Sequence, residues 1–506
     1  MIRLTKGIFC AVMLTGFTSG AGAFSLLGPL KTGGSNGNGW QAPVFGGQPQ
    51  GLGYGLAGDI GGPMEPTEAY RWNIPVITYA YDLTFLRYFG TNGVAAIEEA
   101  MAILNALPPA SQMSADLSEY ALDTKSENGT ASALRLFDIK SFTLATVLEQ
   151  LGLANPERFV WALRGRDAQP PFFTNYTVRQ LNYDPVTLTR SRYVNGVLYN
   201  YQIFDNLGPQ GGEWASAVEW YQLDPLYQPY SSVAGGRGSS DYQLGSSPSD
   251  SFLGIGIFGA GLLTGQFYTG LTRDDVGGLR YLLSTNHMVF DTLPATVLPR
   301  TSGSSGSPWT PVLGFGGTNA AGISNAVTAA GTNFSTFVRT AYRPGVDKIT
   351  FQRVKVFGTN FTPITLRYTD RYISTNGRVV KQSVERLVVQ PDILFRVRDI
   401  GTVRDIPFRS ERSGLDNWIN NSALNTYYPT DGLGGPGTIF PPVVITFSDQ
   451  QPYLINLESG ETDLEAFTGF VWGSFDGTTR PPVVYPQNSV VSLEYLQDVV
   501  LRRTGN

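Results

Sequence analysis

The chain has 506 residues, with 41 acidic against 36 basic side chains, one histidine and one cysteine. This acidic balance, without basic runs, excludes a typical nucleic-acid or anionic-membrane binder. Hydrophobic residues make up 42% of the chain and charged residues 15%, so it can bury a sizeable core. The 59 glycines and 32 prolines favour short strands and turns over long helices.

The first 23 residues have the pattern of a signal peptide. Arg3 and Lys6 form a basic start, residues 8–15 an apolar centre, and Ala21-Gly22-Ala23 a small-residue cleavage site. The only cysteine lies inside this segment, so the exported chain would have no disulfide and no thiolate nucleophile. No later apolar run reaches the ~20 residues of a membrane span. We expect a protein secreted by, or held on the outer envelope of, a Gram-negative-type bacterium.

Residues 24–66 are dominated by Gly, Asn, Gln and Pro. Too little apolar surface is available there to offset the entropy of ordering the backbone. We therefore predict a flexible arm, which serves either as a spacer or as a segment that orders against a neighbouring subunit.

Residues 67–300 are predicted to form an α+β domain. Residues 71–82 favour a strand, and Val94, Ile97, Met101 and Leu104 are spaced as one face of a helix. The predicted central element is an amphipathic helix over 141–156, ended by Gly152.

Later parts of this domain carry turn and cap signals. Asn195-Gly196 is typical of a tight hairpin turn. Thr272 and Asp275 form a capping-box pattern at the start of a helix over 271–283. The apolar, glycine-rich residues 252–263 are too few to span a bilayer, and they predict a buried strand or a subunit contact.

Residues 301–344 are rich in Gly, Ser and Thr and are predicted to be a linker between domains. From 345 to 506 the pattern is strongly β. Val380, Val384 and Val388 alternate with polar residues, as in a half-buried strand, and Asn376-Gly377 indicates a second hairpin. Short strands separated by turns predict an all-β, sandwich-like C-terminal domain.

The predicted order of elements in the first domain resembles that of secreted metzincins of the matrixin type. The resemblance rests on the strand PVITYAYD, the helix GVAAIEEAMAILNAL, the segment LEQLGLANP and the closing helix LTRDDVGGLRYLL. It implies a zincin-like fold, with a degenerate zinc motif in which Gly152 is kept. It covers residues 71–283 in fragments, with a long insertion between 153 and 271.

The zinc motif of that family places its ligands at Ala145, Glu149 and Asn155 and its general base at Thr146. None of these residues is a histidine, and zinc needs three nitrogen, sulfur or oxygen ligands around an open position. Peptidase chemistry, a metal and a cofactor are therefore not expected, even where the scaffold is kept.

Two other groups could carry chemistry. His287 could act as a general base, but no nucleophile motif accompanies it, so a loop histidine is the simpler interpretation. A cluster of carboxylates among aromatic residues could either hydrolyse glycans or form a contact surface. Its acids are Glu213, Glu219 and Asp224, and its aromatic residues are Trp214, Trp220, Tyr221, Tyr227 and Tyr230.

The residues favour an exported, non-catalytic structural or surface-binding protein. The arm and unpaired strand edges would let it associate with itself or with other envelope or extracellular macromolecules. Two alternatives stay open: a polysaccharide hydrolase that uses the carboxylates above, and a catalytically dead peptidase-like protein that binds peptides.

Overall fold

The computed structural model describes most of the chain in nine longer stretches and several short pieces. The longer stretches are 22–26, 70–154, 160–169, 173–203, 264–300, 337–357, 360–398, 441–449 and 471–486. The short pieces are 66, 156, 206–207, 213–214, 217–222, 408–412, 418–420, 437–439, 492–494 and 496–497. These residues form a mixed α and β protein with few helices and many strands in several sheets.

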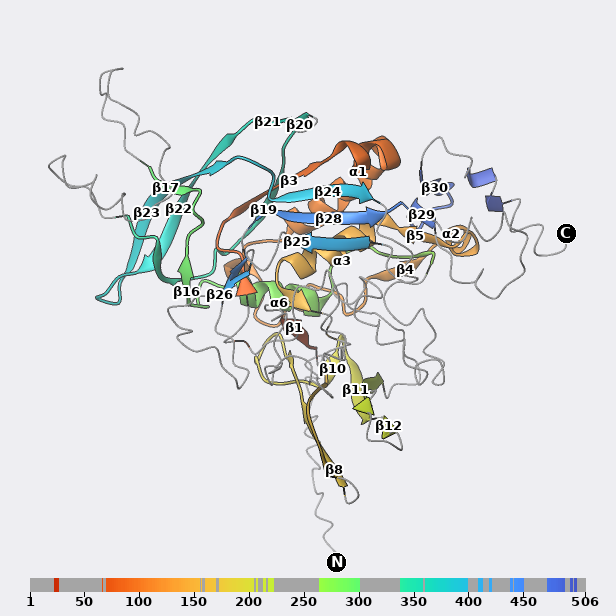
Figure 1. Ribbon diagram of the computed structural model, residues 1–506, viewed down its shortest axis with the longest axis horizontal. Coiled ribbons are helices and arrows are strands. Elements are labelled where there is room, and N and C mark those ends of the chain that lie inside the picture. The colour runs from red at the N-terminus through yellow and green to blue at the C-terminus, as the bar shows by residue number, and fades with distance from the viewer. Residues whose placement is uncertain are drawn as a thin grey trace, which may run out of the picture.

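A five-stranded sheet lies at the centre of the fold (Figure 1). Its order is β19 (Thr350–Arg353), β3 (Val76–Tyr81), β24 (Ile393–Arg398), β28 (Val443–Ser448) and β25 (Phe408–Arg412). The first four strands pair in parallel, with Phe351 opposite Ile77, Ile393 opposite Tyr79 and Val443 opposite Ile393. Only β25 is antiparallel.

This sheet corrects the predicted division into domains. Strand β3 comes from the predicted 67–300 domain, whereas β19, β24, β25 and β28 come from the predicted 345–506 domain. One hydrophobic cluster extends from Phe24 to Tyr485. The 301–344 segment therefore does not separate two cores, and the C-terminal strands of the described chain do not form a sandwich of their own. Within that segment, residues 301–336 lie outside the described residues, and Thr340–Arg343 form strand β18.

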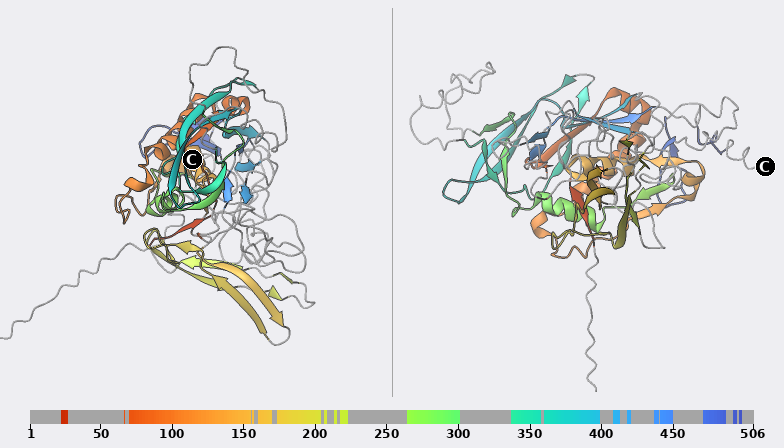
Figure 2. Two further views of the ribbon diagram at one scale, coloured as in Figure 1. Left: turned by 90° about the vertical axis from the view of Figure 1, so that its left-hand side faces the viewer. Right: turned by 60° about the horizontal axis from the view of Figure 1, so that its bottom comes forward.

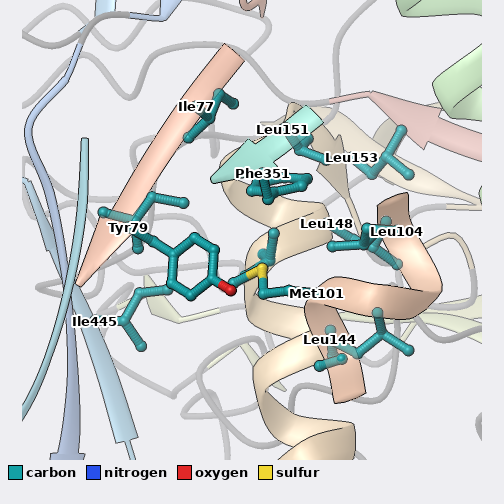
Figure 3. Packing of buried hydrophobic residues seen from close by; sticks show 14 of the residues in the cluster. Ile77, Tyr79, Met101, Leu104, Leu144, Leu148, Leu151, Leu153, Phe351 and Ile445 are labelled. Carbon is teal, nitrogen blue, oxygen red and sulfur yellow. The ribbon is translucent and has the colours of Figure 1, made fainter. Parts of the chain in front are cut away.

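Two helices pack together beside the central sheet (Figure 3). Helix α1 (Leu83–Ala106) follows β3 directly, begins at the N-cap Asp82, and kinks at Gly90, which has a φ of 60°. Its predicted face is buried at Ile97, Met101 and Leu104.

Helix α3 (Ile139–Gln150) confirms the predicted helix, but not its amphipathic character. Every residue of α3 except Lys140 is buried, because the helix contacts α1, β29 (Val471–Ser474), β6 (Leu153–Ala154) and β15 (Gln266–Tyr268). Asp138 caps its start, and its carboxylate accepts hydrogen bonds from both the backbone N–H and the hydroxyl of Ser141.

The start of the predicted flexible arm is part of the core. Strand β1 (Phe24–Leu26) is the middle strand of a three-stranded sheet, between β6 and β9 (Asn182–Tyr183). Phe24 stacks on Tyr281 with ring centroids 5.9 Å apart. Apolar side chains at 24 and 26 supply buried area that the rest of the arm lacks, so the arm prediction was wrong for β1. Residues 27–65 lie outside the described residues.

A second layer is built on a long hairpin. Strands β22 (Ile364–Ile373) and β23 (Val379–Val388) pair along ten residues each, and β17 (Val297–Pro299) pairs with the other edge of β23. Val384 and Val388 are buried, as the alternation predicted. Strands β16 (Val289–Thr292) and β18 pair with each other beside this sheet. Figure 1 shows the hairpin at one end of the molecule.

The remaining elements are short, except for one helix and one hairpin arm. Helix α6 (Arg273–Leu283) has the predicted capping box of Thr272 and Asp275. Strands β7 (Ala162–Gln169) and β8 (Phe173–Arg179) form an arm that projects from the body (Figure 2). Strands β10 (Tyr193–Val194) and β11 (Val197–Ile203) are joined at the predicted turn, where Asn195 and Gly196 have φ of 43° and 85°.

Several small sheets complete the described part of the chain. They pair β2 (Tyr70–Arg71) and β26 (Trp418–Asn420) with β27 (Gly437–Ile439), β4 (Lys125–Glu127) with β15, and β5 (Leu136–Asp138) and β30 (Val483–Val484) with β29. Two further pairs are β12 (Asn206–Leu207) with β13 (Glu213–Trp214), and β20 (Val356–Phe357) with β21 (Asn360–Phe361). Strand β14 (Ala217–Gln222) pairs with β11. Among the described residues, no helix is both long and apolar enough to cross a bilayer.

Candidate functional site

Three of the four positions of the degenerate zinc motif are described, and all three lie inside the protein. Ala145 and Thr146 are buried on α3, and the Thr146 hydroxyl donates to the carbonyl of Phe142 at 2.7 Å. Glu149 is 5% exposed, and Asn155 lies outside the described residues. A peptide could not reach a helix covered on all sides, so the described structure has no open groove along α3. Within the described stretches, no three potential ligands gather into a metal site.

His287 is poorly suited to proton transfer. Burial and the nearby positive charge of Arg71 lower the pKa of His287 to about 3. Its ring lies against Tyr281, with centroids 4.4 Å apart, and its carbonyl accepts a 2.7 Å hydrogen bond from Nη1 of Arg71. An imidazole with this pKa stays neutral at pH 7 and is a weak base. These contacts make His287 a structural residue.

The backbone places part of the predicted carboxylate and aromatic cluster on two short strands. Glu213 and Trp214 form β13, and Glu219, Trp220 and Tyr221 lie on β14. Asp224, Tyr227 and Tyr230 lie outside the described residues. The hydrolase hypothesis therefore stays a prediction.

A shallow hollow of about 350 Å³ lies beside the end of α1. Its walls include Ile103, Leu107, Tyr120 and Leu271, and Glu119 is at its margin. The Glu119 carboxylate accepts a hydrogen bond from the backbone N–H of Ser114 at 3.0 Å. One carboxylate on a mostly apolar wall can hold a ligand, but it does not provide an acid and base pair.

The outer edge of β22 is a second exposed feature. The N–H of Ser374 donates to the carbonyl of Arg378 at 2.9 Å, just beyond the ends of β22 and β23. Hydrogen-bonded pairs recur every second residue in an antiparallel ladder. The even-numbered residues of β22 therefore bond to β23, and the N–H groups of Thr365, Arg367 and Thr369 face the other way. Among the described residues, no strand pairs with that edge.

The two faces of the β22–β23 hairpin differ in chemistry. The covered face carries Asp370, whose carboxylate receives Nε of Arg343 at 3.0 Å and the amide of Gln382 at 2.8 Å. The opposite face carries Arg367, which pairs with Glu385 at 3.3 Å and is 63% exposed. One face is thus fixed to the body by buried charges, while no strand of the described chain covers the outer edge and Arg367 on the other face is exposed.

One constellation was not foreseen from the sequence. Asp274 lies in the first turn of α6, is 0% exposed, and accepts hydrogen bonds at Oδ2 from the backbone N–H groups of Ala23 (2.8 Å) and Asn195 (2.6 Å). Its other oxygen, Oδ1, has no partner in the described part of the chain. The acidic pair Asp274-Asp275 was visible in the sequence, but it signalled only a helix start.

Comparisons with known proteins do not assign the chain to a family. No family model matches the chain, and neither a curated protein nor a solved structure is significantly similar to it. The geometry and the sequence therefore carry the functional argument alone.

Proposed function

We propose that the protein is exported and acts without catalysis, as a structural component that associates with further copies of itself through the outer edge of β22. The observation that carries the proposal is the ten-residue strand β22, paired on one side only within the described chain. An unpaired edge of this length presents a row of N–H and C=O groups that a second strand can complete.

The support beneath β22 makes this edge suitable for assembly. Arg343 and Gln382 fix the covered face through Asp370, so the strand does not have to become ordered when it binds. The edge is extended and regular, since each residue from Ile364 to Ile373 pairs in register with β23. Apolar residues at the two ends of β23, Val379 and the adjoining Val389, are 56% and 52% exposed and could be covered in an assembly.

Replacing Thr369 by proline tests the proposal. Proline at this position removes one of the N–H groups that face the open edge and leaves the ladder to β23 intact, which edge strands tolerate. Thr369→Ala is the matched control, because it changes the side chain but keeps the N–H. We expect the exported protein and Thr369→Ala to form concentration-dependent assemblies in light scattering and sedimentation, and Thr369→Pro to stay smaller with a similar melting temperature.

Two results would count against this function. A wild-type protein that remains monomeric over the whole concentration range would remove self-association. Equal assembly by Thr369→Pro and Thr369→Ala would place the contact on a different surface.

We further infer that the part of the core built from β3, α1, α3 and α6 is zincin-like and has lost its metal ligands. The order of these elements and the capping box of α6 support this, together with the position of α3 against α1. Metal analysis of the purified protein tests the loss of ligands. Stoichiometric zinc bound to the folded chain would contradict it.

A further inference from the structure

The buried carboxylate of Asp274 is surrounded by backbone but lacks a cation at its second oxygen. Oδ2 is held by two N–H groups, and Oδ1 is unpartnered in the described structure. The charged groups near it are Arg273 and Asp275 on its own helix. Arg273 donates instead to the carbonyl of Asp116, and Asp275 accepts from the N–H of Thr272. Burial raises the pKa of Asp274 well above its ordinary value, although the two N–H donors oppose this shift.

Gly22 lies directly against the unpartnered oxygen. A Cβ added to Gly22 would be 2.1 Å from Oδ1 of Asp274 and 3.5 Å from Cδ of Pro185. A larger residue at position 22 would have to push this carboxylate aside, so a glycine keeps Asp274 in its observed place. Ala23 and Phe24 are 0% and 2% exposed, and Phe24 continues into β1. Residues 22–26 are therefore part of the core.

This placement conflicts with cleavage after Ala23, the site that the small-residue run predicts. Such cleavage would remove the Ala23 N–H from Oδ2 and leave a cavity where the Ala23 methyl group is buried. Cleavage two residues earlier fits the same sequence rule, because Ser19 and Ala21 then supply the small residues before the cut.

We propose that a signal peptidase cuts the chain between Ala21 and Gly22, and that the new ammonium group of Gly22 pairs with Oδ1 of Asp274. Water is the co-reactant: its oxygen joins the carbonyl of Ala21 to form a carboxylate, and the nitrogen of Gly22 leaves as an amine that takes up a proton. The α-amino group has an ordinary pKa of about 7.7–8.0, and an adjacent carboxylate favours its charged form. This proposal rests on export, which is part of the proposed function.

The pairing would make processing a late step of folding. An uncleaved chain has a neutral amide at residue 22, so a buried Asp274 would have to be protonated or uncompensated, which is unfavourable. Asp274 also holds the N–H of Asn195, in the turn between β10 and β11. The ion pair between the Gly22 ammonium group and Asp274, once formed, therefore stabilises both the start of α6 and this hairpin turn.

The mass of the N-terminal peptide of the exported protein is the first test. We expect a chain that begins at Gly22. A chain that begins at Phe24 would overturn the proposal and leave export standing, whereas a chain retained with its leader would overturn both.

The second test uses purified proteins that begin at Gly22 or, as an extended form, at Ser19. We expect the Gly22 form to melt several degrees higher, and its amine to react about ten-fold more slowly with an acylating reagent when folded than when unfolded. Asp274→Asn should abolish the difference in melting temperature between the two forms, and Asp116→Asn, which alters an exposed carboxylate, should preserve it.

Equal melting of the Gly22 and Ser19 forms, or an amine that reacts freely in the folded protein, would overturn the pairing. Both readouts use the native Asp274, so they remain decisive if Asp274→Asn does not fold.

Discussion

The central sheet and the layer formed by β16, β18, β22 and β23 both bury side chains against the body of the protein, but the buried contacts differ in chemistry. Beside the sheet, Phe85, Phe89, Phe447 and Trp472 form a continuous aromatic cluster with ring centroids 4.9–6.4 Å apart. In the second layer, Arg343 and other arginines carry much of the contact through ion pairs and carbonyls. An apolar core tolerates small changes of shape, whereas a buried ion pair fails when one partner is lost.

Three buried arginine–aspartate pairs lie in or beside the second layer. Arg71 pairs with Asp291 at 2.9 Å, Arg343 with Asp370 at 3.0 Å, and Arg386 with Asp392. These arginines also donate to the carbonyls of residues 343, 291, 338 and 76. Arg71 thus joins β2 to β16 and β18, Arg343 joins β18 to β22, and Arg386 joins β23 to β3, and in each case the strand of the arginine does not pair through its backbone with the strand that it is joined to.

The largest expected effect comes from breaking one of these pairs. Arg343→Met leaves the buried Asp370 carboxylate with Gln382 alone, and should lower the free energy of unfolding by about 3–5 kcal/mol. Urea denaturation measures this loss. Arg343→Met combined with Asp370→Leu should recover most of it, because both charges are then removed.

The exposed pair of Arg367 and Glu385 is the control for this experiment. Arg367→Met should cost less than about 1 kcal/mol, since the pair is solvated. A loss from Arg343→Met as small as that from Arg367→Met would show that the second layer does not depend on its buried charges.

The aromatic cluster should lose less from a change of shape. Phe89 lies 4.9 Å from the rings of Phe85 and Tyr485, and Phe89→Leu keeps much of its apolar area. We expect a loss of about 2 kcal/mol in urea denaturation. Leu86→Ala, on the exposed side of α1, should change stability by about 0.5 kcal/mol. A larger loss for Phe89→Leu than for Arg343→Met would reverse the comparison.

The sequence predicted what local signals determine. Asn195-Gly196 forms its turn, Thr272 caps α6, and Val384 and Val388 face inward, because each depends on neighbours a few residues away. The parallel pairing of β3 with β24 spans some three hundred residues and leaves no local signal, so the chain was divided into domains that the sheet joins.

The surroundings of Asp274 were not foreseen for the same reason: they depend on contacts between residues that are far apart in the sequence. Asp274 looks like an ordinary acid in the first turn of a helix, where acids are common. Only the fold brings Gly22 and Asn195 against it and makes it a buried carboxylate. The burial of α3 on all sides except at Lys140 was also missed, because tertiary packing covers Thr143 and Thr146, whose hydroxyls bond to carbonyls one turn earlier.

A pH experiment tests His287, which lies between α6 of the apolar core and β16 of the second layer. The pKa of His287 is lowered to about 3 in the folded protein, against an ordinary value of about 6.5 in the unfolded chain. Below pH 6.5 the unfolded chain takes up a proton that the folded protein does not. The free energy of unfolding should therefore decrease as the pH is lowered, by roughly 1–2 kcal/mol between pH 7 and pH 5.

His287→Gln should remove this contribution, and the chain has no other histidine to mask the effect. Asp138, whose pKa burial raises to about 6, acts in the opposite direction: its stabilising effect is lost as the pH rises through 6. The quantity to compare is thus the difference between wild type and His287→Gln across the pH range. A difference that does not change between pH 7 and pH 5 would contradict the lowered pKa.

The smallest effect is expected at the start of α6, which belongs to the apolar region but depends on a polar cap. The Thr272 side chain accepts from the N–H of Asp275, and its hydroxyl also receives the amide of Asn195 at 3.2 Å. Thr272→Ala removes both contacts and should cost about 1 kcal/mol in urea denaturation. Thr272→Ser keeps the hydroxyl and should cost less. Equal losses for the two variants would assign the effect to the methyl group, and α6 would then be held by packing, like the rest of the apolar region.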